Sequence, residues 1–510
     1  MIDSRRDFLR FSVAGISALS LPQTLFASSD NSLDFDDYKA LVVIYQSGGN
    51  DGLNTFIPCS DDAKSGYPNY AKVRDVLRIK DEELSLKTDS SGDLILGKNS
   101  ENPYFSNHDI KESYTKGFYT HTLNGKKLPL ATNPLMPELA HLVNKGKVAI
   151  IANVGNIIQP STKSELLGEL KPKPPFLYAH NHQTKLTYCG EASSLSEQGW
   201  AGRLYDEWSM VNHDEIYGLN ISFGGPELIM YGNDTEPLVL SPYGPVKYNY
   251  PRHWQKKVVK RKRALEDEFF SLPRRDLFQK LYTTMKRHSY TMQDILVKDW
   301  EDAKKNLSFS KTNAYGEKLF SKPSGTTLGE HEPSYTPTKD IVKFEAVARM
   351  AYIGKTKGLK RQIFFIYLGG YDTHSNQTFQ HARNLRALSL GVGDLDRALS
   401  ELGLSDKVTI FNISDFGRST GNNGDGTDHA WGSNTFVLGG AVKGGVYGKL
   451  PDLSLGSDDD LTKKGRLIPT TSMSQLYATI VRWFGADEKT LDKVFYELKN
   501  FSQRDLNFMI

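Results

Sequence analysis

Five short, continuously apolar runs constrain the fold of this chain more than any other feature of its sequence. They are rich in β-branched and aromatic residues and do not alternate between apolar and polar positions. Strands that are buried on both faces have this pattern, as in a parallel sheet covered by helices. The runs are Leu41–Ile44, Val148–Ile151, Ile363–Ile366, Val408–Ile413 and Thr435–Leu438. We therefore predict that these segments are buried strands of one sheet.

Amphipathic helices lie between the predicted strands. Apolar residues recur at steps of three and four from Leu385 to Leu402, and again from Met473 to Phe484. Each of these segments therefore has one apolar face to bury. Strands and helices that alternate in this way are typical of an α/β protein. We expect an α/β fold with a doubly wound, mostly parallel sheet.

The N-terminal residues have the features of an export signal. Two adjacent arginines, Arg5 and Arg6, precede the apolar stretch Phe11–Leu21. That stretch is too short to span a bilayer and suits the core of a signal peptide. Paired arginines at this place resemble a twin-arginine signal, which the twin-arginine export machinery reads as an address. We expect residues 1–27 to form this signal and the protein to be periplasmic or secreted.

The composition excludes two classes of protein. The chain has 63 Lys and Arg and 60 Asp and Glu, a formal net charge of +3. A dedicated nucleic-acid-binding protein carries a marked basic excess instead. No apolar run reaches the roughly 18 residues of a membrane-spanning helix. We therefore expect no nucleic-acid partner and no stable membrane span.

Cysteine is rare, with only Cys59 and Cys189 in the whole chain. In an oxidising compartment the two residues can form a disulfide. They can equally be two unrelated buried thiols, and the sequence leaves this open. Their number and spacing exclude a zinc finger or an iron–sulfur cluster.

A charged segment of helical character lies near residues 250–335. Its basic cluster, Lys256–Arg263, has two interpretations: a landing patch for an anionic polymer, or the solvated face of a helix. Residues 311–338 contain several prolines and glycines and indicate a loop. We expect one α/β domain over residues 38–510, made from two halves of the sequence, with this segment as a helical insertion.

Acidic and imidazole side chains follow three of the predicted strands. Asp51 lies in the glycine-rich loop after the first strand. Asp372 and His374 follow the third strand, and Asp415 and then His429 follow the fourth. Ligands bind outside the carboxyl ends of the strands in an open parallel sheet, so we expect these loops to converge on one edge.

These five side chains offer carboxylate oxygens and imidazole nitrogens as ligands. Such a set suits zinc, manganese, magnesium or calcium and does not suit copper(I) or an iron–sulfur cluster. Two divalent ions about 3.5–4 Å apart can hold both oxygens of an in-line displacement. The sequence therefore predicts a site for one or two divalent metal ions of undetermined identity. Its predicted ligands are Asp51, Asp372, His374, Asp415 and His429.

The same loops carry a family resemblance. Gly48–Thr55, Gly369–His374, Ser414–Arg418 and Gly426–Gly432 resemble segments of a large bacterial family. It is a twin-arginine-exported "domain of unknown function" family, distantly related to the alkaline phosphatase and sulfatase superfamily. The resemblance covers most of residues 38–510 and is weakest in the middle insertion. It implies an alkaline-phosphatase-like core.

The resemblance also implies roles for individual residues. Asp51 resembles the metal-binding aspartate that follows the first strand of the superfamily. Asp372 and His374 resemble a later Asp and His pair, although the usual spacing there is longer. His429 resembles the last metal-binding histidine.

Three further residues take roles by the same resemblance. Asp415 resembles the first member of an Asp-His or Asp-Asn pair, whose second member is replaced here by Phe416. Asp428 is expected to orient the imidazole of His429. Arg418 is expected to bind a tetrahedral oxyanion, for which its planar fork is suited.

The nucleophile of the superfamily is missing at its usual place. Superfamily enzymes carry a serine, threonine or modified residue after the second core strand, at a helix N-terminus. A Ser-His-Asn segment is common there in this family, whereas this chain has Ala179 before His180. Alanine can neither attack an ester nor bind a metal. His180 is then a candidate catalytic or structural histidine, and Ser161 and Thr162 are candidate hydroxyl groups.

Two functions from different classes remain. The first is a periplasmic metal-dependent hydrolase that acts on a phosphate or sulfate ester, with a hydroxyl group or water as the attacking group. The second is a non-catalytic metal- or anion-binding accessory protein of the cell envelope. Ala179 and Phe416 favour the accessory protein, whereas the retained acids and histidines and Arg418 favour the hydrolase. We expect a hydrolase whose partner is an anionic ester or an anionic polymer.

Overall fold

The computed structural model describes residues 35–96, 107–212, 216–245, 255–273, 276–321 and 338–510. The predicted signal peptide, residues 1–27, therefore lies outside the described residues. The chain divides into two compact units. The larger unit comprises Phe35–Gly244 and Asp302–Ile510, and the smaller one contains Pro245–Glu301.

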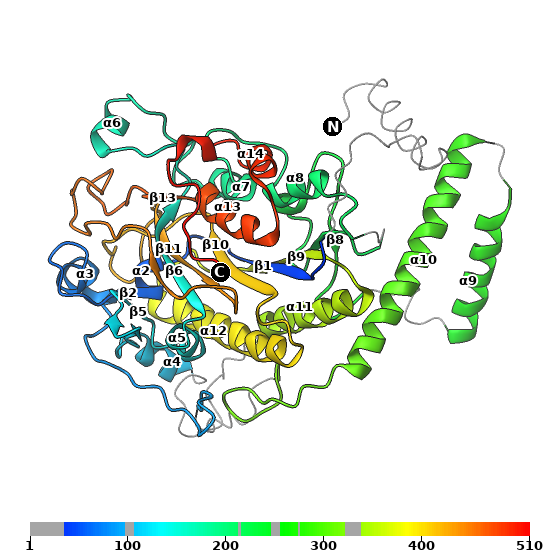
Figure 1. Cartoon of the computed structure of the whole chain (residues 1–510), viewed down its shortest axis with the longest axis horizontal. Helices are drawn as coiled ribbons and strands as arrows, with labels where there is room; N and C mark the ends of the chain where they lie inside the picture. Colours follow the sequence, from blue (N-terminus) through cyan, green and yellow to red (C-terminus); the bar gives the residue numbers. More distant parts are fainter. Residues whose placement is uncertain (1–34, 97–106, 213–215, 246–254, 274–275, 322–337) are drawn as a thin grey trace. The chain divides into compact units, whose positions relative to one another are not determined.

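A sheet forms the core of the larger unit, and nine strands of the described residues belong to it (Figure 1). Its central strands β1 (Lys39–Gln46), β9 (Arg361–Leu368) and β10 (Val408–Ser414) run parallel to one another. β11 (Ser433–Leu438) runs antiparallel both to β10 and to β6 (Val148–Gly155). Each predicted apolar run is a strand, and nearly every side chain in these strands is buried. The expectation of an α/β fold with a mostly parallel sheet is confirmed.

Shorter strands complete the sheet in the order β12-β6-β11-β10-β1-β9-β7-β8, with β13 paired to β6. Two small two-stranded sheets, β2 with β5 and β3 with β4, lie outside it. The bounds of these strands are β2 (Phe56–Pro58), β3 (Thr122–Leu123), β4 (Lys126–Lys127), β5 (Leu130–Thr132), β7 (Asn220–Ser222), β8 (Leu238–Val239), β12 (Gly445–Tyr447) and β13 (Thr471–Ser472).

Helices pack against the sheet of the larger unit, with α5, α11 and α12 on one side and α7 and α13 on the other (Figure 1). Their bounds are α2 (Gly52–Thr55), α3 (Tyr67–Arg74), α4 (Asn107–Tyr114), α5 (Pro137–Asn144), α6 (Lys163–Leu167), α7 (His180–Cys189), α8 (Trp200–Glu207), α11 (Thr338–Lys357), α12 (Gln377–Glu401), α13 (Met473–Phe484) and α14 (Glu488–Val494).

The two helices predicted from apolar periodicity are α12 and α13. α13 spans the predicted residues because Ser472 starts it with a capping box, in which Gln475 reaches back to the N-cap. α12 begins earlier than its apolar repeat, at Gln377, and Leu402 caps its end. Both helices bury their apolar face.

The smaller unit contains two helices, α9 (Lys256–Ser271) and α10 (Leu277–Asn306). α10 continues beyond the bounds of that unit to Asn306. Helices therefore occupy the charged segment of the sequence. Most of the predicted loop at 311–338 lies outside the described residues. Among the described helices, none has both the length and the apolar character needed to cross a membrane.

The two cysteines are not bonded to each other, since both are free thiols. The Sγ atom of Cys59 donates to the carbonyl oxygen of Leu128 at 3.3 Å, and that of Cys189 donates to Ser196 at 3.4 Å. Burial raises the pKa of each thiol to about 11. Both cysteines are therefore protonated at neutral pH. The sequence left open whether they form a disulfide, and in the structure they are two unpaired thiols.

Candidate metal centre

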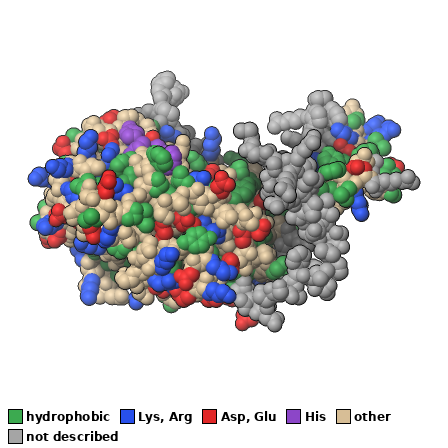
Figure 2. Space-filling model, turned by 90° about the horizontal axis from the view of Figure 1, so that it is seen from above, with side chains coloured by type: hydrophobic (Ala, Val, Ile, Leu, Met, Phe, Trp, Pro, Cys, Tyr) green, Lys and Arg blue, Asp and Glu red, His purple; other side chains and the backbone are tan. Residues whose placement is uncertain are grey.

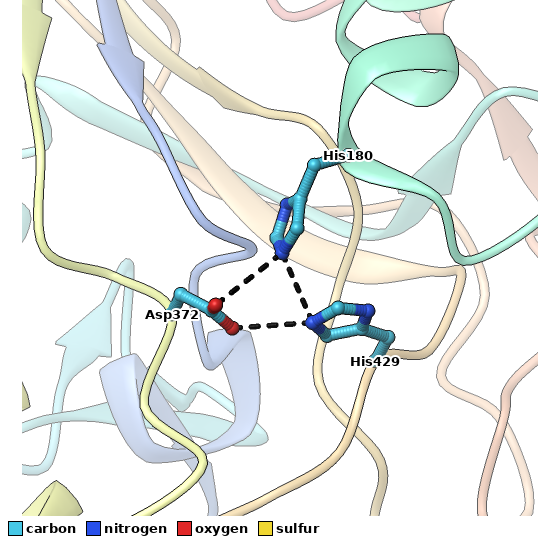
Figure 3. Close-up of side chains that lie close together, drawn as sticks. All are labelled: His180, Asp372 and His429. Carbon is cyan, nitrogen blue, oxygen red and sulfur yellow. Dashed lines mark hydrogen bonds and ion pairs between the residues drawn. The ribbon is translucent and has the colours of Figure 1, made fainter.

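Loops at the carboxyl ends of β9 and β10 meet the first turn of α7 and bring three ligand groups together (Figure 3). His180 is the first residue of α7, Asp372 follows β9, and His429 lies between β10 and β11. One ligand atom of each residue lies within 4.8 Å of the other two. Histidine side chains reach the surface together on the face shown in Figure 2. The structure thus gathers side chains from three distant parts of the sequence.

The imidazoles of His180 and His429 are each held by a hydrogen bond at Nδ1. His180 Nδ1 donates to Asp415 Oδ2 at 2.5 Å, and His429 Nδ1 donates to the carbonyl oxygen of Tyr178 at 2.8 Å. Because a carboxylate and a carbonyl can only accept, each neutral ring carries its proton on Nδ1 and a lone pair on Nε2. Metal-binding histidines are usually oriented in this way.

The two Nε2 atoms of His180 and His429 lie only 3.0 Å apart. Two nitrogen lone pairs that face each other at this distance repel unless a proton or a metal ion lies between them. The residues present therefore fit a cation. No ring N–H is available there while both rings are neutral, and in that state a metal ion would bind both nitrogens at once.

Asp372 supplies a carboxylate to this pair. Its Oδ1 atom lies 3.1 Å from His429 Nε2, and its Oδ2 atom lies 3.5 Å from His180 Nε2. Burial acts to raise the pKa of Asp372, but the adjacent Arg418 guanidinium outweighs it and the pKa is lowered. Asp372 is therefore ionised at neutral pH and adds a negative charge beside the two imidazoles.

His374 adds a third imidazole on the solvent side. Its Nε2 atom lies 2.8 Å from His429 Nε2 and 3.2 Å from Asp372 Oδ1. Its Nδ1 atom lies 3.4 Å from Asp428 Oδ1. Asp428 thus orients His374, which corrects the expectation that it orients His429.

The titration of the two inner histidines differs. The hydrogen bond to Asp415 raises the pKa of His180, against the effect of burial. Burial lowers the pKa of His429, against its hydrogen bonds to Tyr178 and Asp372. His180 therefore binds a proton more readily than His429 does.

Asp415 lies behind the centre as a support for His180. Its Oδ1 atom accepts hydrogen bonds from the backbone of Gly48 at 3.0 Å and Gly49 at 2.7 Å. Gly48 has φ +118°, and a Cβ there would collide with the backbone nitrogen of Asp372, so this turn requires glycine. The sequence predicted Asp415 as a direct ligand, whereas the structure gives its carboxylate to His180 and the β1 loop.

Asp51 lies outside the group. Its buried carboxylate forms an ion pair with Arg74 at 2.6 Å and accepts a hydrogen bond from Gln377 at 2.6 Å. It also caps α2, accepting from the backbone of Leu53 and Asn54 at 3.2 Å each. Both oxygens and the charge are therefore engaged, and the structure gives Asp51 a structural role in place of the predicted metal-binding one.

Arg418 is also engaged within the protein. Its side chain is fully buried and donates to the carbonyl oxygens of Gly49, Tyr371 and Thr427 and to the carboxylate of Asp372. The guanidinium therefore has no exposed face for a ligand. Instead of binding an oxyanion as predicted, Arg418 ties three loops together and positions Asp372.

The hydroxyl group predicted at Thr162 has a structural role. Thr162 begins α6 and forms a capping box with Glu165, with its Oγ1 atom 2.9 Å from Glu165 Oε2. Ser161 donates to the carbonyl oxygen of Gln159 at 2.9 Å. These contacts hold a loop, and none of them joins either hydroxyl group to the histidines.

Three supporting groups had no role in the centre predicted from the sequence. The Tyr178 carbonyl accepts from His429, and Tyr178 itself has φ +71°, which is strained for a bulky residue. Arg466 lies 4.1 Å over the Tyr178 ring and donates to the carbonyl of His429 at 2.9 Å. The Phe416 ring lies 4.7 Å from the rings of both His180 and His429. A backbone carbonyl group carries no motif by which a sequence could reveal it.

The fold and the centre define a mixed α/β protein with a histidine- and aspartate-lined candidate metal site at one edge of its sheet. The chain belongs to the family described as "Protein of unknown function (DUF1501)", which matches residues 38–502. This agrees with the resemblance found in its loops. A search of curated proteins gave no match.

Several solved structures are similar to the chain at low identity. Ps i-CgsB shares 12% identity over 72% of this chain and 71% of its own, with a TM-score of 0.32. The phosphonate monoester hydrolase SpPMH from Silicibacter pomeroyi shares 11% over 69% of each chain, with a TM-score of 0.27. A structure from work on glycosaminoglycan metabolism by Bacteroides thetaiotaomicron shares 10% over 88% and 73%, with a TM-score of 0.29. Scores this low do not establish a common fold.

Proposed function

We propose that the chain is a metal-dependent hydrolase of phosphate or sulfate esters, with one divalent ion held by His180, Asp372, His374 and His429. One observation carries this proposal. The Nε2 atoms of His180 and His429 face each other at 3.0 Å while Asp415 and the Tyr178 carbonyl engage their Nδ1 atoms. Such a pair of imidazoles is arranged to share a cation.

The spacing of the four groups supports a single ion. Their ligand atoms are separated by 2.8–3.5 Å in the contacts between them. Two ligands at about 2.0–2.1 Å from a tetrahedral zinc ion lie about 3.3–3.4 Å apart. Three imidazoles favour zinc over magnesium and calcium, which prefer oxygen ligands. A second ion has less support, since Asp51 and Asp415 are engaged elsewhere.

A divalent ion in this place would supply Lewis-acid chemistry, polarising an ester oxygen and lowering the pKa of water. The side chains around it set the access of a substrate. Asp372 and His374 are each almost half exposed, whereas Asp415 is buried. The Asp372 and His374 side is therefore the most exposed side from which an anionic ester can approach.

Water is the attacking group in this proposal, because Ala179 offers no hydroxyl group. Water adds to the phosphorus or sulfur atom as the bond to the leaving oxygen breaks. One proton of the water passes to solvent or a nearby base, and the leaving oxygen takes up a proton to become the alcohol. The products are an alcohol and inorganic phosphate or sulfate, without a covalent enzyme intermediate.

A second candidate function is a metal- or anion-binding accessory protein of the cell envelope. The burial of Arg418 favours it, since this arginine is then not free to hold the transferred group. Ala179 also favours it, because alanine has no hydroxyl group that could attack an ester. In this case the site binds its ion without turnover.

The functional proposal extends to export and architecture. We propose that the twin-arginine machinery exports the protein, so that it acts in the periplasm or outside the cell. We also propose that residues 38–510 form one doubly wound, alkaline-phosphatase-like domain. This domain has an insertion near residues 250–335. Replacing Arg5 and Arg6 by lysine should trap the precursor in the cytoplasm. Normal export of that variant would exclude the twin-arginine route.

The hydrolase proposal is tested with purified protein reconstituted with zinc or manganese and a panel of phosphate and sulfate monoesters. The wild type should hydrolyse at least one ester class, and His429→Asn should lose this activity. His288→Asn, at an exposed histidine of α10, is the matched control and should stay active. Bound metal with no turnover of any ester would favour the accessory protein instead.

A further inference from the structure

Helices α9 and α10 form an antiparallel hairpin, and side-chain contacts join the two helices. Arg263 of α9 forms an ion pair with Asp294 of α10 at 2.7 Å. Nearer the turn of the hairpin, the ring of Phe270 lies 6.0 Å from that of Tyr290 and 6.2 Å from that of Tyr282. These contacts define the side of each helix that faces the other.

Large apolar side chains lie exposed on another side of both helices. No residue of α9 is buried, and hydrophobic and basic side chains lie at the surface of this unit (Figure 2). The exposed fractions of these apolar residues lie between 43% and 60%. They are Val258, Leu265, Phe269 and Leu272 of α9 with the adjoining turn, and Leu277, Phe278 and Met285 of α10.

The two apolar sets fall on one side of the hairpin. At about 100° per residue, the α9 set is centred about 140° around the helix from the side that faces α10. The α10 set is displaced by about the same angle in the same rotational sense. Because the helices are antiparallel, equal displacements in the same sense point to the same side. Exposed polar residues, Lys260 and Asp267 among them, lie on the opposite side of α9.

Basic residues accompany this apolar face. Arg261 and Lys262 lie on either side of the α9 set, each about 50° from its centre. Lys262 has Glu266 as a partner at 3.7 Å. Lys257 and Arg261 are exposed and form no ion pair with any described residue. The apolar face therefore lies beside unneutralised positive charge.

We propose that this hairpin face binds the surface of an anionic phospholipid bilayer. Helices that lie in a membrane interface combine an apolar face with lysine and arginine on its flanks. The apolar side chains would enter the boundary between headgroups and acyl chains, and the unpaired cations would contact anionic headgroups. The charge selects a lipid surface over a second copy of the chain, which offers the same positive charge. The hairpin would hold the catalytic unit at a membrane.

Vesicle binding of the full chain tests this proposal. The probes are vesicles of phosphatidylglycerol and phosphatidylcholine in equal parts, and vesicles of phosphatidylcholine alone. The wild type should bind the anionic vesicles and bind the neutral ones much more weakly. Combined Leu265→Gln, Phe278→Gln and Met285→Gln should reduce partitioning to the anionic vesicles by at least about tenfold, since the apolar area no longer enters the lipid.

A second variant tests the charge independently of the apolar face. Lys257→Gln and Arg261→Gln together should weaken binding strongly at low salt, since each cation contributes on the order of fivefold near an anionic surface. The matched controls replace exposed residues of the larger unit and should leave binding unchanged. They are Leu170→Gln, 79% exposed in the wild type, and Lys463→Gln with Lys464→Gln.

Three results would overturn the proposal. The first is no binding to anionic vesicles by the wild type. The second is equal binding by wild type and both variants, which would assign the affinity to another segment such as the N-terminal apolar stretch. The third is a concentration-dependent dimer that the apolar variant loses while no vesicle binding occurs, which would assign the face to a second copy. Circular dichroism and thermal unfolding of each variant confirm that the chain is folded in every comparison.

Discussion

His180 and His429 face each other with their Nε2 atoms 3.0 Å apart, although 249 positions separate them in the chain. Asp415 and the Tyr178 carbonyl fix the outer nitrogen of each ring. Neither imidazole can turn away to relieve the repulsion of the inner lone pairs without losing a hydrogen bond. This arrangement is the basis for assigning a cation to the centre, and it leads to tests on the surrounding residues.

Arg418→Lys should weaken metal binding about 10–100-fold, the usual effect of losing a group that orients a ligand. A lysine has one ammonium group and cannot reproduce the contacts of the guanidinium with Asp372 and three carbonyl oxygens. Titration with zinc against a competing chelator measures the change. Arg482→Lys, at a surface ion pair with Glu488, is the control. Unchanged affinity in Arg418→Lys would remove its positioning role.

Asp51→Asn should destabilise the fold by about 3–5 kcal/mol while leaving the metal content unchanged. The substitution leaves the Arg74 guanidinium buried without its countercharge. Urea unfolding followed by fluorescence measures the free energy of unfolding, and mass spectrometry measures the metal. Combining it with Arg74→Met should restore part of the stability. Loss of metal with unchanged stability would instead return Asp51 to the ligand set.

Stability should fall as the pH is lowered below about 6.5. Burial lowers the pKa of His121 and of His381 to about 4, whereas an unfolded histidine titrates near 6.5. Between these values the unfolded chain binds protons that the folded chain does not, so acid favours unfolding. The stabilisation is complete above about pH 6.5 and is lost as the pH falls through about 4. Each histidine contributes about 3 kcal/mol to the free energy of unfolding above about pH 6.5.

His381→Gln isolates one of these two contributions. The His381 ring lies 2.8 Å from the Tyr114 hydroxyl and 2.9 Å from Asn50 Oδ1, which a glutamine can reach in part. We expect the variant to have a shallower loss of unfolding free energy between pH 6.5 and 4, measured by urea titrations across this range. A slope identical to that of the wild type would show that His381 titrates normally in the folded chain.

Ala179→Ser should stabilise the protein by about 1 kcal/mol and preserve metal binding. Ala179 is the N-cap of α7 and has an extended backbone, but its side chain cannot accept a hydrogen bond. Serine at an N-cap accepts from the backbone of the first turn, and this contributes about 0.5–2 kcal/mol relative to alanine. Thermal and urea unfolding measure the gain. A decrease in stability or the loss of bound metal would contradict the prediction.

The sheet could be predicted because its strands are buried on both faces. Leu41–Ile44 and Ile363–Ile366 are continuous apolar runs for this reason, and both are strands in the structure. The direction of a strand cannot be predicted from this apolar pattern. β11 runs antiparallel to its neighbours, yet its sequence has the same apolar character as that of the parallel strands.

The candidate centre could be predicted only in part. Asp372, His374 and His429 were found because they follow predicted strands. The sequence could not distinguish a ligand from a buried support, since that depends on partners from distant elements. Asp51 is paired because Arg74 lies on α3, and Asp415 is a support because α7 brings His180 to it.

The metal content of the purified chain after reconstitution with zinc is the most direct test of the metal centre. It is measured by mass spectrometry on wild type, on His180→Asn with His429→Asn, and on the control His288→Asn. We predict one bound ion per chain in the wild type and the control, and none in the double variant. A wild-type chain that binds no zinc, manganese or other divalent ion, or a double variant that keeps its ion, would contradict the metal centre.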